Sequence, residues 1–238
     1  MKKHIITLGL SSFLLFGCTE LQQITSNLPT VDNSGGISNS KIADGLKQAL
    51  EFGVQDGIQK LGKTNGFYGN QLTRILLPEE LQKVDKTLRN IGLGSLADEG
   101  LKLLNRAAED AVNEATPIFI NAIKGMTFND AKGILFGADN AATSYLQNRT
   151  TSQLFTAFQP KVKNSLGKVG ADKIWEQIFT QYNRISGQNI TTDLNAYVTE
   201  QAIDRVFKMV EDKENGIRKN IGLRSTPLLQ EVFGLLDK

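Results

Sequence analysis

Apolar side chains recur every three or four residues over the first regular segment of the chain. A period near 3.6 residues places such positions on one face of an α-helix. Gly45, Gly53 and Gly57 fall in the same segment, and each lowers helix propensity by about 1 kcal/mol relative to Ala. We expect them to admit another helix backbone, because no strand precedes them to form a phosphate-binding loop. The stripe that predicts this helix consists of Ile42, Leu46, Leu50, Val54, Ile58 and Leu61.

Residues 64–77 interrupt the period with Asn-Gly and Gly-Asn pairs, but they are too apolar for a solvated loop. We expect this segment to pack on the core or to edge a groove. After it, Pro78 suits the first turn of a helix that ends near Ile91. The next helix is predicted to start at a capping box of Ser95 and Asp98 and to break or kink at Pro117.

The helical period continues to the end of the chain. Thr127 and Asp130 form a second capping-box pattern, which predicts a short helix ending near Gly137. Asp139 is a candidate cap for the following helix, and another is predicted from Thr151 or Ser152 with a bend at Pro160. The remaining predicted helices cover 174–182, 194–209 and 226–233. Strand-type alternation is essentially missing, so we predict an all-α fold: one compact domain over 38–238 with about eight to ten helices.

The first 17 residues have the pattern of an export signal. Lys2 and Lys3 are followed by an uncharged, largely apolar run from Ile5 to Phe16. This run of about 12 residues is too short for a transmembrane helix, which needs roughly 20, so residues 1–17 are predicted to be a signal peptide. Residues 18–37 contain turn-forming residues and no helical period, which indicates a flexible tether with a reach on the order of 25 Å.

The sequence Leu15-Phe16-Gly17-Cys18 resembles a bacterial lipobox. In such precursors the cysteine receives diacylglycerol, the signal is cut before it, and the new amino group is usually acylated. Several acyl chains give stable membrane anchoring. Cys18 is therefore the predicted lipidation site, and the membrane is the first expected partner. Thr19, in place of Asp, resembles the default outer-membrane sorting context. We expect a lipid-anchored protein of the bacterial cell envelope, in the outer membrane and facing the periplasm; the alternative is an ordinary secretory signal with an incidental free cysteine.

Cys18 and His4 are the only cysteine and histidine of the chain. After signal removal and acylation, the mature chain would offer neither imidazole nor free thiol, which excludes Cys-His and Ser-His-Asp catalysis and zinc sites built on these residues. We therefore expect no metal and no cofactor. Removal of Lys2 and Lys3 leaves 25 basic residues, equal to the 25 acidic ones. Such a balance does not favour nucleic acid as a partner.

Two polar groups at helical spacing are candidates for a ligand or anion site. One surrounds Arg106 and Glu109, which are close enough along a helix to interact. The other lies on the predicted short helices between 130 and 150. The alternative is structural, because capping would account for Asp139 and ion pairing for Arg106 and Arg149. Trp175, Phe179 and the other aromatics at helical spacing are expected in the core. The candidate site consists of Arg106, Glu109, Asp139, Thr143, Tyr145, Arg149 and Thr150.

Several longer strings resemble a widespread family of Gram-negative bacterial lipoproteins that is catalogued as a domain of unknown function. They include Ala43–Leu50, Asn105–Glu109, Thr127–Leu135 and Asp139–Leu146, followed by Arg149–Thr151, Tyr197–Thr199 and Leu228–Phe233. The resemblance covers nearly everything after the tether. It implies an envelope location and a helical fold, and it implies no reaction and no catalytic residues.

Three functions remain open at this stage. The leading hypothesis is a non-enzymatic binding module for an envelope protein or for an apolar or lipid ligand, since a helical bundle offers apolar clefts between its helices. The second is an envelope enzyme that works with carboxylates and arginines. The third is a purely structural component of the envelope.

Overall fold

The computed structural model describes residues 37–188, 190 and 192–237. From Asn39 onward the chain forms one compact unit. Its described residues contain nine α-helices, two 3₁₀ helices and no strand, so the predicted all-α class is confirmed. In chain order the elements are α2 (Asn39–Leu61), α3 (Glu79–Asn90), α4 (Gly94–Ala111), η1 (Val112–Glu114), α5 (Ala115–Lys124), α6 (Phe128–Leu135), α7 (Ala141–Lys168), α8 (Ala171–Ser186), α9 (Leu194–Lys219), η2 (Ile221–Leu223) and α10 (Pro227–Gly234).

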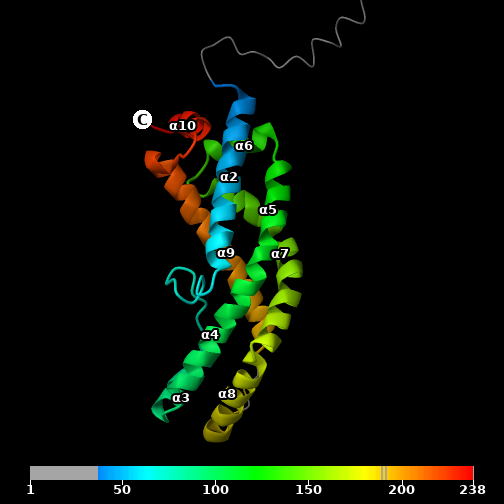
Figure 1. Cartoon of the computed structure of the whole chain (residues 1–238), viewed down its shortest axis with the longest axis vertical. Coiled ribbons are helices and arrows are strands. Elements are labelled where there is room, and N and C mark those ends of the chain that lie inside the picture. The colour runs from blue at the N-terminus through cyan, green and yellow to red at the C-terminus, as the bar shows by residue number, and fades with distance from the viewer. Residues whose placement is uncertain (1–36, 189, 191, 238) are drawn as a thin grey trace, which may run out of the picture. The chain divides into compact units, whose positions relative to one another are not determined.

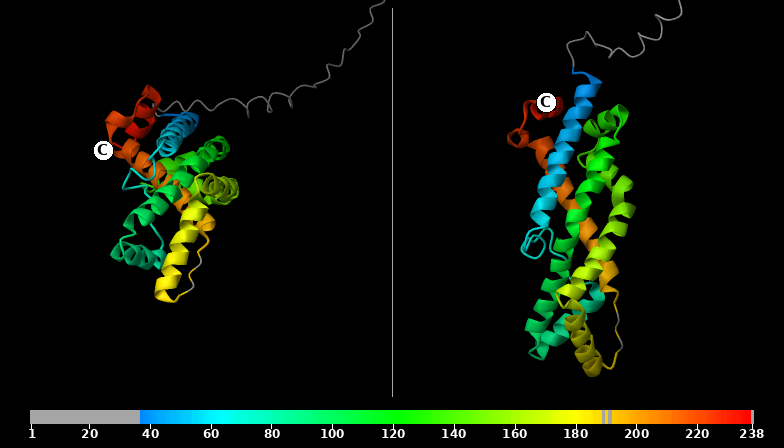
Figure 2. Two further views of the ribbon diagram at one scale, coloured as in Figure 1. Left: turned by 60° about the horizontal axis from the view of Figure 1, so that its bottom comes forward. Right: turned by 45° about the vertical axis from the view of Figure 1, so that its right-hand side comes forward.

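The helices of this unit form a bundle around α9, which packs against α2, α4 and α7. The beginning of α2 lies at one end of the bundle together with α6 and α10 (Figures 1 and 2). We call this the α6 end. At the opposite end lie α3 and α8, with the beginning of α9 beside α8. We call this the α8 end.

Helix α2 confirms the first predicted helix and the role of its glycines. Its apolar stripe is buried along its whole length. A Cβ atom on Gly45 would lie 2.5 Å from Cγ2 of Val232 in α10. One on Gly57 would lie 2.9 Å from Cγ of Met209 in α9. The glycines therefore let α9 and α10 approach the backbone of α2.

The two predicted capping boxes have different outcomes. The one at Thr127 and Asp130 is confirmed, because the Thr127 hydroxyl accepts from the Asp130 N–H and the Asp130 carboxylate accepts from the Thr127 N–H. The one at Ser95 is wrong, because α4 already begins at Gly94 and has no side-chain cap. Asp98 accepts hydrogen bonds from Arg89 of α3 instead, so its carboxylate joins two helices.

The predicted break near Pro117 occurs slightly earlier, at the 3₁₀ turn η1, and Pro117 lies in the first turns of α5. Such a position suits proline, whose missing N–H matters least near a helix start. Residues 64–77 contain no helix, as predicted. Phe67 and Ile75 of this segment are fully buried, so it packs on the core.

Helix α7 replaces two predicted helices with one. It continues from Ala141 to Lys168 through Pro160. Leu146, Leu154 and Phe158 belong to a single buried face, so core contact is maintained throughout. Pro160 lies on the exposed side. Because proline has no N–H, one backbone carbonyl of the preceding turn loses its partner, and on this side that carbonyl can bond to water. The helix therefore passes through the proline.

The start of α7 also differs from the prediction. Asn140 holds the cap position and gives no side-chain hydrogen bond. Asp139 does not cap the helix, because its carboxylate pairs with Lys219 Nζ at 2.6 Å. Among all the described residues, no helix combines the length and apolar character needed to cross a membrane.

Candidate functional site

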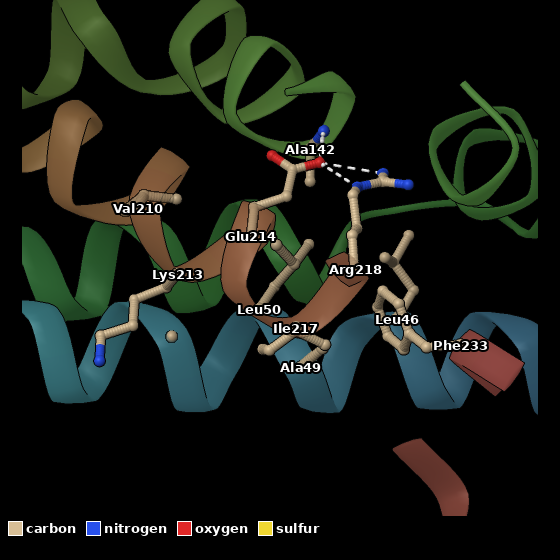
Figure 3. Close-up of a pocket in the computed structure, with 11 residues that line it drawn as sticks. Leu46, Ala49, Leu50, Ala142, Val210, Lys213, Glu214, Ile217, Arg218 and Phe233 are labelled. Carbon is tan, nitrogen blue, oxygen red and sulfur yellow. Dashed lines mark hydrogen bonds and ion pairs between the residues drawn. The ribbon is translucent and has the colours of Figure 1, made fainter. Parts of the chain in front are cut away.

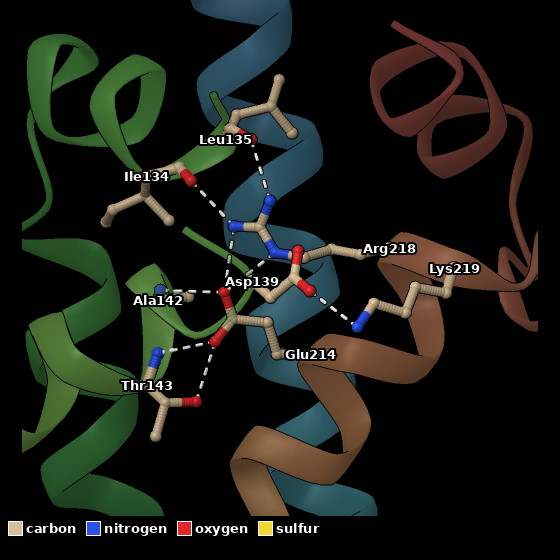
Figure 4. Close-up of polar contacts among 8 residues, drawn as sticks. All are labelled: Ile134, Leu135, Asp139, Ala142, Thr143, Glu214, Arg218 and Lys219. Carbon is tan, nitrogen blue, oxygen red and sulfur yellow. Dashed lines mark hydrogen bonds and ion pairs between the residues drawn. The ribbon is translucent and has the colours of Figure 1, made fainter. Parts of the chain in front are cut away.

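The most buried charged pair of the unit lies on α9, near its C-terminal end. Glu214 Oε1 accepts from the Ala142 N–H at 2.9 Å, and Oε2 accepts from the N–H and hydroxyl of Thr143, both at 2.8 Å (Figure 4). These amides belong to the first turn of α7, where helix N–H groups lack partners within the helix. A carboxylate also suits the positive end of the helix dipole. Glu214 thus supplies the cap that Asn140 does not.

Arg218, one turn further along α9, bonds the end of another helix. Its Nη1 and Nη2 donate to the carbonyls of Leu135 and Ile134 at 2.9 and 2.8 Å, at the end of α6. Its Nε donates to Glu214 Oε1 at 3.0 Å. The two side chains are only 5% and 4% exposed. Because both carboxylate oxygens and the guanidinium are occupied, the pair joins α6, α7 and α9 and has little capacity left for a substrate.

A small cavity lies beside this pair, between α2, α9, α10 and the beginning of α7 (Figure 3). Leu46, Leu50 and Phe233 are among the apolar residues that line it. Its volume is about 20 Å³, which is enough for a water molecule. A small-molecule pocket usually has roughly 300–1,000 Å³, so this cavity does not hold a lipid in the described conformation.

Arg106 and Glu109 hold the irregular segment 64–77 against α4. Glu109 is buried, and its Oε1 accepts from the Phe67 N–H at 3.2 Å. Arg106 Nη1 donates to Glu109 Oε2 at 3.2 Å and to the Thr64 hydroxyl at 3.0 Å. These two residues line an open pocket of about 370 Å³ with Tyr68 and other residues of the segment. The structural alternative explains their contacts, and ligand binding there stays a prediction.

Asn105 is a further anchor of this segment that sequence analysis did not identify. Its Oδ1 accepts from the Ile75 N–H at 2.8 Å, and its Nδ2 donates to the Ile75 carbonyl at 2.9 Å. Asn105 is completely buried. The sequence does place Asn105 directly after Leu104, on the buried side of a predicted helix. Because a buried amide needs hydrogen-bond partners, this position could have indicated an anchoring residue.

The other candidate residues lie on or just before α7 and have separate partners. Arg149 lies over the Tyr145 ring, with 5.4 Å from Cζ to the ring centroid. Burial raises the pKa of the Tyr145 hydroxyl. Thr150 donates to the Leu146 carbonyl one turn back, at 2.7 Å. The hydrogen bond from Lys219 lowers the pKa of the Asp139 carboxyl. The Thr143 hydroxyl donates to the Glu214 carboxylate. None of these residues lines the Arg106 pocket.

A larger groove lies at the α8 end, between the end of α7, α8 and the beginning of α9. Its volume is about 640 Å³, and it is open to solvent. Gly170 and Gly187 lie directly before and after α8, with φ of 74° and 68°. Glycine adopts this left-handed conformation without strain. The chain leaving Gly187 supplies one wall of the groove. Its lining residues are Lys163, Leu166, Asp172, Trp175, Glu176, Phe179, Thr180, Asn183, Ile190, Thr192, Asp193, Leu194 and Asn195.

Two aromatic residues, Trp175 and Phe179, line this groove. Trp175 is 2% exposed, which confirms its predicted place in the core. Its indole N–H donates to the Gly100 carbonyl at 3.2 Å. The centroids of the Trp175 and Phe179 rings are 5.6 Å apart. Phe179 is half-buried and also lines the groove. The core prediction therefore holds for Trp175 but only in part for Phe179.

The charged lining of the groove is mainly acidic. It consists of Asp172, Glu176 and Asp193 with one basic residue, Lys163. Asn195 Oδ1 is shielded from solvent and has no hydrogen-bond partner among the described residues. Shielded oxygens of this kind normally have a donor, so Asn195 Oδ1 is a buried acceptor whose hydrogen-bonding capacity is unused in the described part of the chain. Sequence analysis missed these residues, because only the fold brings residues 163–195 together.

No described group of three or more Asp, Glu, His or Cys side chains is arranged to hold a metal ion. Cys18 and His4 lie outside the described residues. Among known families, the one described as "Protein of unknown function (DUF4197)" has a model that matches residues 36–234. Neither the curated proteins nor the solved structures contain a match to this chain.

Proposed function

The chain belongs to the DUF4197 family, and from that premise we propose that it is an envelope lipoprotein whose helical domain is a non-enzymatic binding module. Two parts of the chain support this proposal. One is the lipobox-like sequence at Leu15–Cys18, which would supply the membrane anchor. The other is the groove at the α8 end, which would receive a partner.

The lining of the groove indicates the chemistry of that partner. Apolar side chains in its lining, among them Phe179 and Leu194, favour a segment with apolar side chains of its own. The excess of carboxylates over Lys163 favours a positively charged segment, since complementary charge supports specific association. A polypeptide segment with apolar and basic residues meets both requirements.

Two observations favour a protein partner over an enclosed lipid or a substrate. The cavity inside the bundle is about 20 Å³, far below the roughly 300 Å³ at which small-molecule pockets begin. In addition, Glu109, Arg106, Glu214 and Arg218 all bond to groups of the protein itself. Both facts support binding at an open surface as the function.

Photocrosslinking in intact cells tests the groove. Benzoylphenylalanine in place of Phe179 is expected to give a specific adduct, which Glu176→Lys should reduce several-fold, because it reverses one of the groove's carboxylates. Asp44→Lys is the matched control, since Asp44 is also an exposed helical carboxylate but lies on α2. An adduct that is insensitive to Glu176→Lys, or equally sensitive to Asp44→Lys, would contradict the proposal.

A further inference from the structure

Two exposed aromatic rings lie at the ends of helix α6, one on its first residue and one on the residue that follows its last turn. Phe128 and Phe136 are 58% and 52% exposed, which is high for Phe. They lie eight residues apart with Lys132 midway, so the three side chains follow the four-residue spacing of one helix face. Lys132 and Gly133 are also exposed, and a Cβ atom at Gly133 would meet nothing within 4 Å. No described part of the chain therefore covers this face around Gly133.

The same end of the bundle carries a second group of exposed apolar residues. Ile221 and Leu223 of η2, which follows α9, are 62% and 53% exposed. Leu235, directly after α10, is 44% exposed. Contacts of Lys41 and Gly45 with α10 place the beginning of α2 beside that helix. Both groups thus flank the place where the chain enters α2.

We infer that the α6 end of the domain rests on a lipid bilayer, with Phe128 and Phe136 in the membrane interface. Exposed apolar groups that gather in one region mark an interaction surface. A helix face with aromatic rings and a lysine suits the interface, because the rings reach the acyl boundary and the ammonium stays near lipid phosphates.

The position of the proposed anchor selects lipid over other occupants. This inference rests on the proposed acylation of Cys18, which lies about 20 residues before α2. A flexible segment of that length reaches on the order of 25 Å, so the anchor would hold the α6 end close to the bilayer. Helix α9 has 26 residues and would place the groove at the α8 end on the order of 40 Å further away.

Tryptophan quenching by brominated lipid tests this orientation. The acylated full chain is reconstituted in vesicles of phosphatidylethanolamine and phosphatidylglycerol, with or without brominated acyl chains. Trp175 is the only tryptophan, and it is buried in α8, so the wild-type protein is expected to lose little fluorescence. Phe136→Trp should lose roughly half of its emission, because one of its two indoles would lie in the interface.

Ile185→Trp is the matched control. Ile185 is 46% exposed and lies in the last turn of α8, at the α8 end. Quenching of Phe136→Trp but not of Ile185→Trp supports the inference. Equal quenching of both means that the domain lies flat on the bilayer, and this overturns it.

The remaining outcomes separate the inference from the proposed anchor. A Phe136→Trp emission that is shifted to the blue but not quenched shows that a protein surface, such as a second copy, covers α6. If the chain floats with the vesicles and neither variant is quenched, the anchor stands and the inference fails. A chain that carries no acyl groups and remains unbound overturns the anchor, and the inference falls with it.

Discussion

Glu214 and Arg218 lie one turn apart on α9, yet they bond the ends of two other helices: Glu214 the first turn of α7, and Arg218 the last carbonyls of α6. Glu214→Ala would leave the Arg218 charge buried without its counterion. Removal of one partner from a buried pair lowers the free energy of unfolding by about 3–5 kcal/mol. Urea denaturation followed by circular dichroism measures this loss. Asp139→Ala, which breaks an exposed ion pair nearby, should change stability little. A Glu214→Ala protein as stable as the wild type would refute the capping role.

Asn105→Ala should release the segment 64–77 from α4. The substitution removes both partners of the Ile75 backbone, and unsatisfied buried groups cost about 1–3 kcal/mol each. We expect faster hydrogen exchange in this segment together with a lower melting temperature. Asn121→Ala, an exposed change on α5, is the control. Unchanged protection around Ile75 would show that Asn105 does not hold the segment.

Two glycine substitutions should have opposite effects on stability. Gly45→Ala places a methyl group 2.5 Å from Val232 Cγ2, so α10 must move and the melting temperature should fall. Gly133→Ala meets nothing within 4 Å and should raise stability by about 0.5–1 kcal/mol, because Ala favours the helix more than Gly does. Calorimetry of both variants tests this contrast. A Gly45→Ala protein as stable as the wild type would contradict the close packing of α2 on α10.

Acid should weaken the attachment of the chain's end to α9. Arg224 is buried and donates to Asp237 Oδ1 at 2.8 Å, and this hydrogen bonding lowers the pKa of the Asp237 carboxyl. A carboxyl with a lowered folded-state pKa stabilises the fold above its unfolded pKa and loses that contribution as the pH falls through the folded value. Wild type should therefore exceed Asp237→Asn in stability at neutral pH, and the difference should shrink below a pH of about 4.

Urea midpoints across this pH range measure the effect. Asp44→Asn controls for general carboxyl titration, because Asp44 is exposed on α2. A difference between wild type and Asp237→Asn that stays constant down to the lowest pH would show that the Asp237 charge does not matter.

Cys18 is predicted to carry acyl chains in the mature protein. Mass spectrometry of membrane-extracted protein should therefore show a chain that begins at Cys18 and is heavier by its lipid groups. Cys18→Ser should abolish both the cleavage and the membrane association. Detection of an unmodified thiol in the mature wild-type protein would contradict the lipobox interpretation.

Helix positions could be predicted where a local pattern determines them. The stripe in α2 and the Thr127–Asp130 capping box are set by residues close in sequence, and both formed as expected. The continuity of α7 could not be predicted, because it depends on which side of the helix Pro160 faces. Ser95 failed as a cap because α4 already begins at Gly94, which places Ser95 inside the helix.

The candidate site was predictable only in part, for the same reason. Arg106 and Glu109 interact as their spacing suggested, but their link to Thr64 and Phe67 requires the folded segment. Glu214 and Arg218 appear in the sequence as an ordinary pair four residues apart, of a kind common on exposed helix faces. Their partners lie 71 to 84 positions away, so no local pattern reveals them. The groove is likewise formed by residues from three separate segments.

The late place of α9 in the chain also determines when the fold can be completed during synthesis. Residues 194–219 supply the surface against which α2, α4 and α7 pack, and every nascent chain that ends before Leu194 lacks it. Formation of the core must therefore wait until most of the polypeptide has left the ribosome, since contacts between residues distant in sequence form late. For a precursor with the proposed export signal, this delay extends the time in which the chain remains open enough to be threaded across a membrane.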